Sequence, residues 1–174
     1  MRRGSVRREV VVRVDADTAW RVVSRPDVLH HWFPGIVDCR VDGDTRTVTL
    51  GTGLTLQETI LTNDPLQRRF QYRIAGGPFT EHLATLDVVA LGDDASLVTY
   101  ASDAAPATMA IVLGGATAGA LAELRRQLEA GEGPALAAVA ATPDGAGDRP
   151  AVPRPAGGPA PAGAPDRPAH RGGR

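Results

Sequence analysis

Six short strand-like segments follow one another between residues 36 and 102, and turn-forming residues separate each segment from the next. The segments alternate apolar and polar residues and are each short enough for one strand. Their connections contain Gly, Asp, Asn and Pro, as in Asp42-Gly43-Asp44 and Gly76-Gly77-Pro78. Closely spaced strands with short polar connections predict an antiparallel meander. The predicted strands are residues 36–41, 45–50, 54–61, 70–74, 80–89 and 97–102.

Four further elements flank this meander. Valines alternate with polar residues over 6–14, which predicts a half-buried first strand. Asp15 or Asp17 is placed to cap a short helix, and Pro26 to begin a second one that stops before Pro34. A long helix is predicted from about residue 106 to 130, with an apolar stripe formed by Leu113, Thr117, Ala120, Leu121, Leu124 and Leu128. This order predicts an α+β fold, in which a curved antiparallel sheet of about seven strands buries its concave face against the long C-terminal helix.

Composition divides the chain near residue 130. Residues 131–174 consist mostly of Ala, Pro and Gly, and they contain no aromatic residue. Such a segment buries too little apolar surface to offset its chain entropy, so we expect a disordered tail there. Residues 1–130 hold all seven aromatic residues and are long enough for an independent core. The sequence therefore predicts one domain over 1–130.

The net charge and the cysteine content argue against several classes of function. The formal net charge is −1, so no global field favours nucleic acid or an anionic membrane, and we expect no nucleic-acid partner. The single cysteine, Cys39, forms no disulfide within the chain and is expected to be a small buried residue. His30 and His31 are adjacent, so they point in different directions and no zinc-like spacing results. We expect no metal and no cofactor.

One segment is long enough and free enough of charge to be considered as a membrane span. Residues 104–122 contain no charged residue, but Ala, Gly and Thr dominate them, and charges follow at 123, 125 and 126. A core helix with a buried first half and an amphipathic second half explains both parts. Gly115 and Gly119 are spaced to let such a helix approach a sheet closely. With no apolar signal segment at the N-terminus, we expect a cytoplasmic protein without a membrane span.

The order of elements, with these residues, resembles the SRPBCC superfamily, also called START-like or helix-grip, and its polyketide cyclase/dehydrase-like branch. Asp17-Thr18-Ala19-Trp20 resembles the family's first helix, and residues 29–36, with Trp32 and Pro34, resemble its L-x-x-W-x-P-x-V segment. Residues 10–14, 39–43, 56–60, 64–72 and 97–100 stand where the family's strands do. The resemblance covers about residues 6–129. It implies a helix-grip fold with a cavity between sheet and long helix, which relatives use for sterols, lipids, quinone-like molecules, hormones or aromatic polyketides.

Strand faces give the candidate site residues. Glu58 lies on an otherwise apolar face with Leu54, Leu56 and Ile60, and His82 lies on a similar face of residues 80–88. The faces of two other strands carry Tyr72 and Tyr100, so four polar tips are expected to converge on one cavity. Glu58 and His82 are candidates for acid–base catalysis, and all four for ligand orientation. Alternatively, Glu58 pairs with a buried Arg or a backbone donor and the residues are structural.

Trp32 and Phe33 lie in the segment that borders the cavity in relatives, where they form either a gate for an apolar ligand or ordinary packing. The leading hypothesis is a monomeric protein that binds a small hydrophobic molecule, lipid-, polyketide- or quinone-like. One alternative is a cyclase or dehydratase that uses Glu58 and His82. Another is a domain that modulates a protein partner through the tail.

Overall fold

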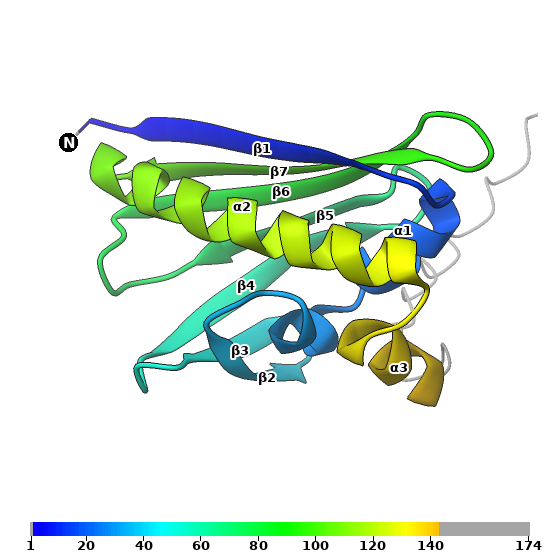
Figure 1. Ribbon diagram of the computed structural model, residues 1–174. Helices are drawn as coiled ribbons and strands as arrows, with labels where there is room; N and C mark the ends of the chain where they lie inside the picture. The colour runs from blue at the N-terminus through cyan, green and yellow to red at the C-terminus, as the bar shows by residue number, and fades with distance from the viewer. Residues whose placement is uncertain (1, 143–174) are drawn as a thin grey trace, which may run out of the picture. The chain divides into compact units, whose positions relative to one another are not determined.

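A computed structural model describes residues 2–142 of the chain. Seven strands and three helices follow the predicted order, a fourth helix that was not predicted comes after them, and the long helix crosses one face of a single curved sheet (Figure 1). The elements are β1 (Gly4–Val12), α1 (Ala16–Val23), the 3₁₀ helix η1 (Pro26–His31), β2 (Ile36–Asp42), β3 (Thr45–Leu50), β4 (Thr55–Asp64), β5 (Arg69–Ile74), β6 (Glu81–Ala90), β7 (Ser96–Ala105), α2 (Ala107–Ala130) and α3 (Pro134–Ala141).

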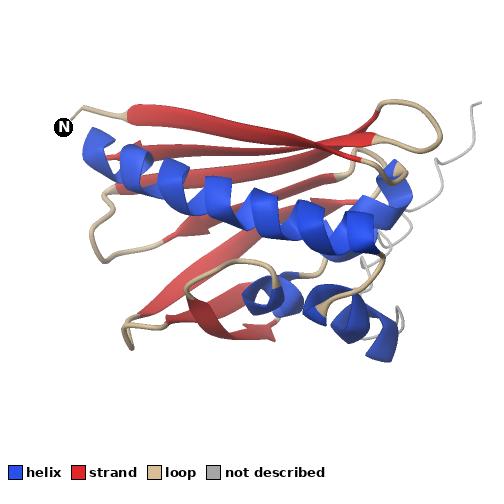
Figure 2. Cartoon of the chain, viewed as in Figure 1, coloured by secondary structure: helices blue, strands red, loops and turns tan. Residues whose placement is uncertain are grey.

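The sheet is antiparallel throughout and has the strand order β1-β7-β6-β5-β4-β3-β2. Strands β2 to β7 form the predicted meander, and β1 pairs with β7 at the far edge. The register shifts between Ile36 and Asp38 and again between Ile60 and Thr62, which are irregularities that increase strand bending. Figure 2 shows the resulting sheet curving around α2. The α+β helix-grip prediction is confirmed.

The inner face of the sheet follows the predicted alternation. In β6, His82, Ala84, Leu86 and Val88 are buried, and their neighbours in sequence are more exposed. Tyr72 on β5 and Tyr100 on β7 are buried on the same face. This face, α1, η1 and α2 enclose the core, so the polar tips expected at the cavity do lie inside the domain.

Helix α2 begins after Pro106 and ends at Gly131, which adopts a left-handed conformation with φ of 69°. It packs mainly on β1 and β7. Its length and mean hydropathy would allow it to cross a membrane, but Ala120, Leu121 and Leu124 on its inner side are buried in the domain. In the described part of the chain it is the single helix with this property, and it serves as the core helix.

The glycines that allow close packing of α2 are not those expected. Gly115 and Gly119 are exposed, and an added Cβ would meet open space at both. Gly114 is buried instead, and an added Cβ there would lie 2.7 Å from Cγ2 of Val6 on β1. The prediction of close approach was right, but it named the wrong glycines, because only the helix's rotation about its axis decides which residue faces the sheet.

The predicted boundary at residue 130 was too early. Helix α3 follows within the segment expected to be disordered, and its Ala135 is fully buried. The compact unit that holds the rest of the domain includes α3. Ala is the best helix former, and its small side chain lets α3 pack closely against η1, α1 and α2. The rest of the expected tail, residues 143–174, lies outside the described residues.

Candidate functional site

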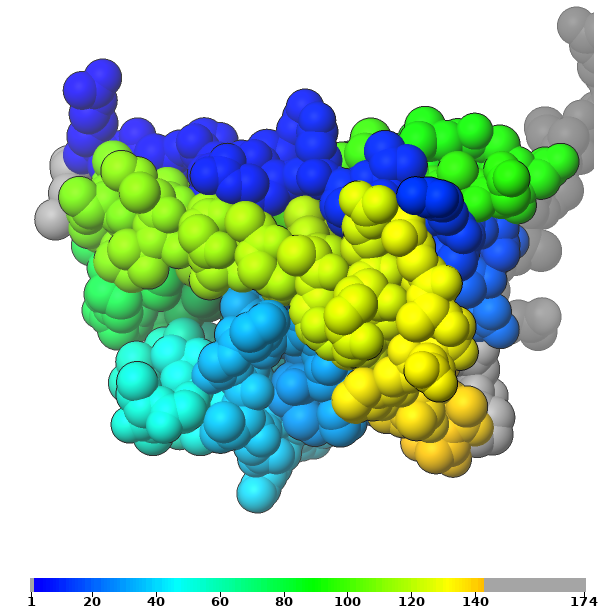
Figure 3. All heavy atoms as spheres, in the orientation of Figure 1, coloured from blue at the N-terminus to red at the C-terminus, as the bar shows by residue number. Residues whose placement is uncertain are grey.

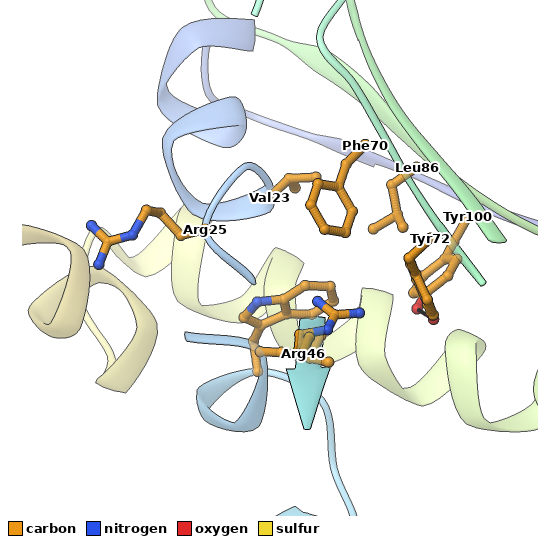
Figure 4. Close-up of a pocket in the computed structure, with 9 residues that line it drawn as sticks. Val23, Arg25, Arg46, Phe70, Tyr72, Leu86 and Tyr100 are labelled. Atoms are coloured by element: carbon orange, nitrogen blue, oxygen red, sulfur yellow. Dashed lines mark hydrogen bonds between the residues drawn. The ribbon is translucent and has the colours of Figure 1, made fainter. Parts of the chain in front are cut away.

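A small pocket lies between the inner face of the sheet and the α1–η1 segment. Trp32 and the end of α1 contribute to its lining, together with aromatic residues of β5 and β7. Figure 4 shows Val23 of α1 beside Phe70 of β5, with Tyr72 and Tyr100 close together. The volume that the centre of a water molecule can occupy in the pocket is only about 10 Å³, so the pocket has room for about one water. The cavity implied by the family resemblance is therefore nearly filled by side chains. The lining residues are Val23, Arg25, Leu29, Trp32, Arg46, Phe70, Tyr72, Leu86 and Tyr100.

Glu58 pairs with a buried arginine. Arg46 on β3 faces Glu58 on β4 in the strand register, and Nε of Arg46 donates to Oε2 of Glu58 at 2.5 Å. The side chains are 2% and 5% exposed. Burial raises the pKa of the Glu58 carboxyl, and the charge and hydrogen bond of Arg46 oppose that rise. Of the interpretations offered for Glu58, pairing with a buried Arg is the one that the structure contains.

Arg46 is the residue that sequence reasoning missed. The sequence did indicate that Arg46 faces the interior, because Arg46, Val48 and Leu50 share one strand face while threonines occupy the other. Moreover, Arg46 and Glu58 stand at equal distances on either side of Thr52 in the hairpin loop. Hairpin register alone therefore places them opposite one another.

Aromatic rings surround the Arg46 guanidinium. Its central carbon lies 4.6 Å from the ring centroid of Tyr72 and 5.4 Å from that of Phe70, which are cation–π distances. The hydroxyls of Tyr72 and Tyr100 hydrogen-bond to each other at 2.5 Å. Burial raises the pKa of Tyr100 to about 12, and it raises the pKa of Tyr72 well above 10. Both phenols are therefore neutral at physiological pH.

His82 lies beside this cluster. Its ring centroid is 5.6 Å from that of Tyr72 and 5.2 Å from that of Phe79. Nδ1 accepts a hydrogen bond from the backbone N–H of Ile74 at 3.0 Å, so Nε2 carries the proton of the neutral ring. Burial lowers the pKa of His82 to about 4. Nε2 is buried without a hydrogen-bond partner in the described part of the chain.

The structure brings together three of the six predicted site residues. Trp32, Tyr72 and Tyr100 line the pocket, whereas Glu58, His82 and Phe33 lie outside its lining. Phe33 packs edge-on against Tyr100 with a ring distance of 6.3 Å. Glu58 and His82 do not hydrogen-bond to each other within residues 2–142.

Two polar groups of the pocket lining have no hydrogen-bond partner. Nε1 of Trp32 and Nη2 of Arg46 are both buried, and nothing in the described residues accepts their hydrogens. Buried donors without partners are rare in native proteins and cost free energy. The pocket therefore presents two donors for which the described residues supply no acceptor.

Cys39 is buried, as predicted, whereas the expectation that His30 and His31 point in different directions was wrong. The Cys39 thiol donates to the carbonyl of Pro26 at 3.1 Å, and burial raises the pKa of the thiol to about 11. The ring centroids of His30 and His31 lie 3.9 Å apart, with the ring planes tilted by 41°. Among the described residues, no group of three or more His, Cys, Asp or Glu side chains is arranged to hold a metal ion.

Most of the chain resembles known proteins in sequence pattern and in fold. Residues 3–129 match the family described as polyketide cyclase / dehydrase and lipid transport. The comparison with curated proteins gave no match. Solved structures that resemble the chain share less than 25% of its sequence, so they show the fold alone.

Three of these structures illustrate the range of the fold. A norcoclaurine synthase point mutant from Thalictrum flavum, in complex with a transition-state analogue, has 21% identity and a TM-score of 0.60; 73% of this chain and 94% of that chain are covered. The di-domain ARO/CYC BexL of the BE-7585A biosynthetic pathway has 17% identity and a TM-score of 0.64, and the match covers 74% of this chain and 47% of that chain. A START superfamily protein from Mycobacterium smegmatis has 21% identity and a TM-score of 0.59, covering 72% and 94%.

The family match spans well over half of the chain, and the helix-grip fold agrees with it. The chain therefore belongs to the polyketide cyclase / dehydrase and lipid transport family.

Proposed function

We propose that this protein binds a small aromatic molecule with carbonyl or phenolic oxygens, such as a polyketide- or quinone-like compound, in the pocket lined by Trp32 and Arg46. The observation that carries the proposal is the pair of buried donors without partners, Nε1 of Trp32 and Nη2 of Arg46. A ligand oxygen would accept these hydrogen bonds and remove the cost of leaving them unmade.

The walls of the pocket favour a flat ring system. Four of its nine lining residues are aromatic, so an aromatic ligand would lie against aromatic faces and edges; they are Trp32, Phe70, Tyr72 and Tyr100. A flexible acyl chain would leave the polar tips of this lining without partners. These features favour the polyketide- and quinone-like classes over a simple lipid.

The charge balance favours a neutral ligand. Arg46 is already neutralised by Glu58, so a bound carboxylate would add an uncompensated negative charge to a buried site. A ketone, quinone or phenol would satisfy the free donors without that cost. The proposal includes a cytoplasmic location, as expected from the sequence.

Acid–base catalysis is the second candidate function. The observation in its favour is the neutral His82, whose Nε2–H is buried beside Tyr72 and has no partner in the described residues. In a cyclase or dehydratase, this group and Glu58 would exchange protons with the ligand. The partner hypothesis concerns the expected tail, of which residues 143–174 lie outside the described residues.

The test begins with the ligand itself. Native mass spectrometry of the protein purified from its own host, before and after organic extraction, should reveal an adduct and give the mass of the ligand. We expect an aromatic molecule containing oxygen. An extractable fatty acid would contradict the proposed class, and a clean apo mass would count against a tightly held ligand.

A matched pair of variants then tests the site. Trp32→Phe removes one donor and keeps an aromatic ring, and it should weaken binding of the extracted ligand about tenfold without loss of stability. Trp20→Phe, outside the pocket lining, should leave affinity unchanged. Equal affinities for all three proteins would overturn the proposed role of Trp32. If the ligand is a substrate, His82→Gln should abolish its conversion and preserve binding.

A further inference from the structure

The pocket has room for about one water molecule, so one of its walls has to move before it can admit a larger ligand. Five lining residues, Arg46, Phe70, Tyr72, Leu86 and Tyr100, lie on strands held by the hydrogen-bonded ladder of the sheet. The other four lie at the end of α1, in η1 and in the two residues that flank η1. The α1–η1 segment is therefore the wall that can move at the lowest cost.

Element η1 has little stability of its own. It is a six-residue 3₁₀ helix, a type with poorer hydrogen-bond geometry than the α-helix. Its N-cap residue, Arg25, makes no capping hydrogen bond through its side chain. Contacts from other elements must therefore hold η1, and with it Trp32, against the pocket.

Gln127 of α2 provides one such contact, and it joins η1 to α3. Its side chain is buried, and Nε2 donates to the carbonyl of His31 at 2.9 Å, while Oε1 accepts from the backbone N–H of Ala135 at 2.9 Å. Gly133 lies against this side chain so closely that an added Cβ would be 2.6 Å from Cγ of Gln127. One amide thus ties the end of η1 to the beginning of α3.

Arg25 provides a second contact at the other end of α3. Its Nη1 donates to the carbonyl of Thr142 at 2.9 Å, and its Nε and Nη2 bind the carboxylate of Asp27 within η1. Arg25 also lines the pocket, and Figure 4 shows its guanidinium pointing away from the other labelled side chains. Both ends of α3 are therefore attached to residues at the movable wall.

Helix α3 lies beyond the part of the chain that matches the family, which ends at residue 129. It packs against η1, α1 and the end of α2, and its surface continues that of α2 in the space-filling view (Figure 3, gold beside yellow). The family fold does not account for this element, yet it touches the segment that must move.

We propose that α3 is a latch that holds η1 and Trp32 closed over the pocket, and that ligand entry requires α3 to release η1. The identity of the pocket as a ligand site rests on the proposed function, whereas the mechanical coupling of α3 to η1 does not. Release of α3 would withdraw the N–H of Ala135 from Gln127 and the carbonyl of Thr142 from Arg25, which are two hydrogen bonds that couple α3 to this wall.

Amide exchange in the full-length protein tests the coupling without a ligand. Ala135→Asp places a charge at a fully buried position of α3, and Ala137→Asp places the same charge on its exposed side. By NMR, the Trp32 indole N–H should exchange with solvent at least tenfold faster in Ala135→Asp and at the wild-type rate in Ala137→Asp. The backbone N–H of Val98 in β7 reports global unfolding and should not change.

A second variant keeps the test decisive if Ala135→Asp unfolds. Gln127→Leu removes both tethering hydrogen bonds and should speed exchange of the Trp32 indole in the same way. The N–H of Ala137, bound to the carbonyl of Gly133, reports whether α3 has been released. Fast exchange at Ala137 with unchanged exchange at Trp32 would overturn the latch.

The rate of ligand entry separates the latch from the proposed function. With 1-naphthol as probe, stopped-flow quenching of tryptophan fluorescence should show faster association in Gln127→Leu than in the wild type. Faster indole exchange without any 1-naphthol binding would support the latch and count against an aromatic ligand site. Binding at equal rates in both proteins would support the site and overturn the latch.

Discussion

Arg46 and Glu58 face each other on neighbouring strands in the interior of the domain, with Nε of the one 2.5 Å from Oε2 of the other. Taking two charges out of water costs more than their attraction returns unless the geometry is good. Another nitrogen of the guanidinium, Nη2, has no hydrogen-bond partner among the described residues, so the hydrogen-bonding capacity of the buried Arg46 side chain is not fully used. A buried ion pair of this kind lowers the stability of the fold. Its presence is better explained by the ligand oxygen that we propose for the pocket.

Removing one partner of this ion pair should be far worse than removing both. Glu58→Gln should lower the free energy of unfolding by about 3–5 kcal/mol, because it leaves Arg46 charged, buried and without a counter-ion. The double variant Arg46→Met/Glu58→Met should recover most of that loss. Urea denaturation measures both, and a double variant less stable than Glu58→Gln would show that the pair is stabilising.

The same double variant should lose ligand affinity in spite of its recovered stability. Its apolar side chains donate no hydrogen bond to a ligand oxygen. Isothermal titration with the ligand extracted from the host provides the measurement. Unchanged affinity would remove Arg46 from the proposed site.

The two tyrosines should show coupled energetics. Tyr72→Phe leaves the hydroxyl of Tyr100 buried without its partner, and Tyr100→Phe has the converse effect. Each single variant should lose about 1–2 kcal/mol, and the double variant should lose less than the sum, with a coupling of about 1 kcal/mol. Additive losses in denaturant unfolding would mean that the hydroxyls do not stabilise each other.

His82 should make the fold sensitive to mild acid. Burial lowers its pKa to about 4, below the ordinary value of 6.5, so the unfolded chain binds more protons between these values. The contribution of His82 to stability is therefore complete above pH 6.5 and is lost as the pH falls toward 4. Between pH 7.5 and 5 the loss should be about 2 kcal/mol.

His82→Gln is the matched control for this titration. Gln does not titrate, and its side-chain oxygen can still accept from the backbone N–H of Ile74. Comparing urea midpoints at pH 7.5 and 5 for both proteins isolates the histidine from the exposed carboxylates. Parallel losses in the two proteins would assign the acid sensitivity to other groups.

Adjacent glycines of α2 should respond in opposite ways to the same substitution. Gly114→Ala forces a methyl group against Val6 and should cost about 1–3 kcal/mol. Gly115→Ala meets open space and should gain up to about 1 kcal/mol from helix propensity. Thermal unfolding of the two variants tests this contrast, and similar shifts in Tm would mean that α2 does not approach β1 as closely as described.

The elements of the fold were predictable because their signals are local. Alternation along β6 and β7 identified the buried faces of His82 and Tyr100, and Pro106 and Gly131 marked the ends of α2. The family resemblance supplied the helix-grip arrangement, and the family match confirmed it. Composition misjudged α3, because an Ala-rich segment appears too weakly apolar for a core when its neighbours are not known.

The candidate site was only partly predictable because it depends on packing between distant segments. Strand periodicity placed Tyr72 and Tyr100 inside, and the tertiary structure added their mutual hydrogen bond and the contact of the Arg46 guanidinium with the rings of Tyr72 and Phe70. Periodicity also placed Glu58 and His82 inside, yet neither lines the pocket. Which of several inward-facing groups meet is set by register and sheet curvature.

The sequence by itself determined the order of elements and the face that each buries, since side-chain direction repeats every two residues in a strand and every 3.6 in a helix. The tertiary structure alone decided that the Arg46 guanidinium lies against Phe70 and Tyr72, that the pocket is nearly filled, and that Gln127 connects α3 to η1. These outcomes depend on close packing between segments far apart in the chain, where a shift of one methyl group changes which atoms touch.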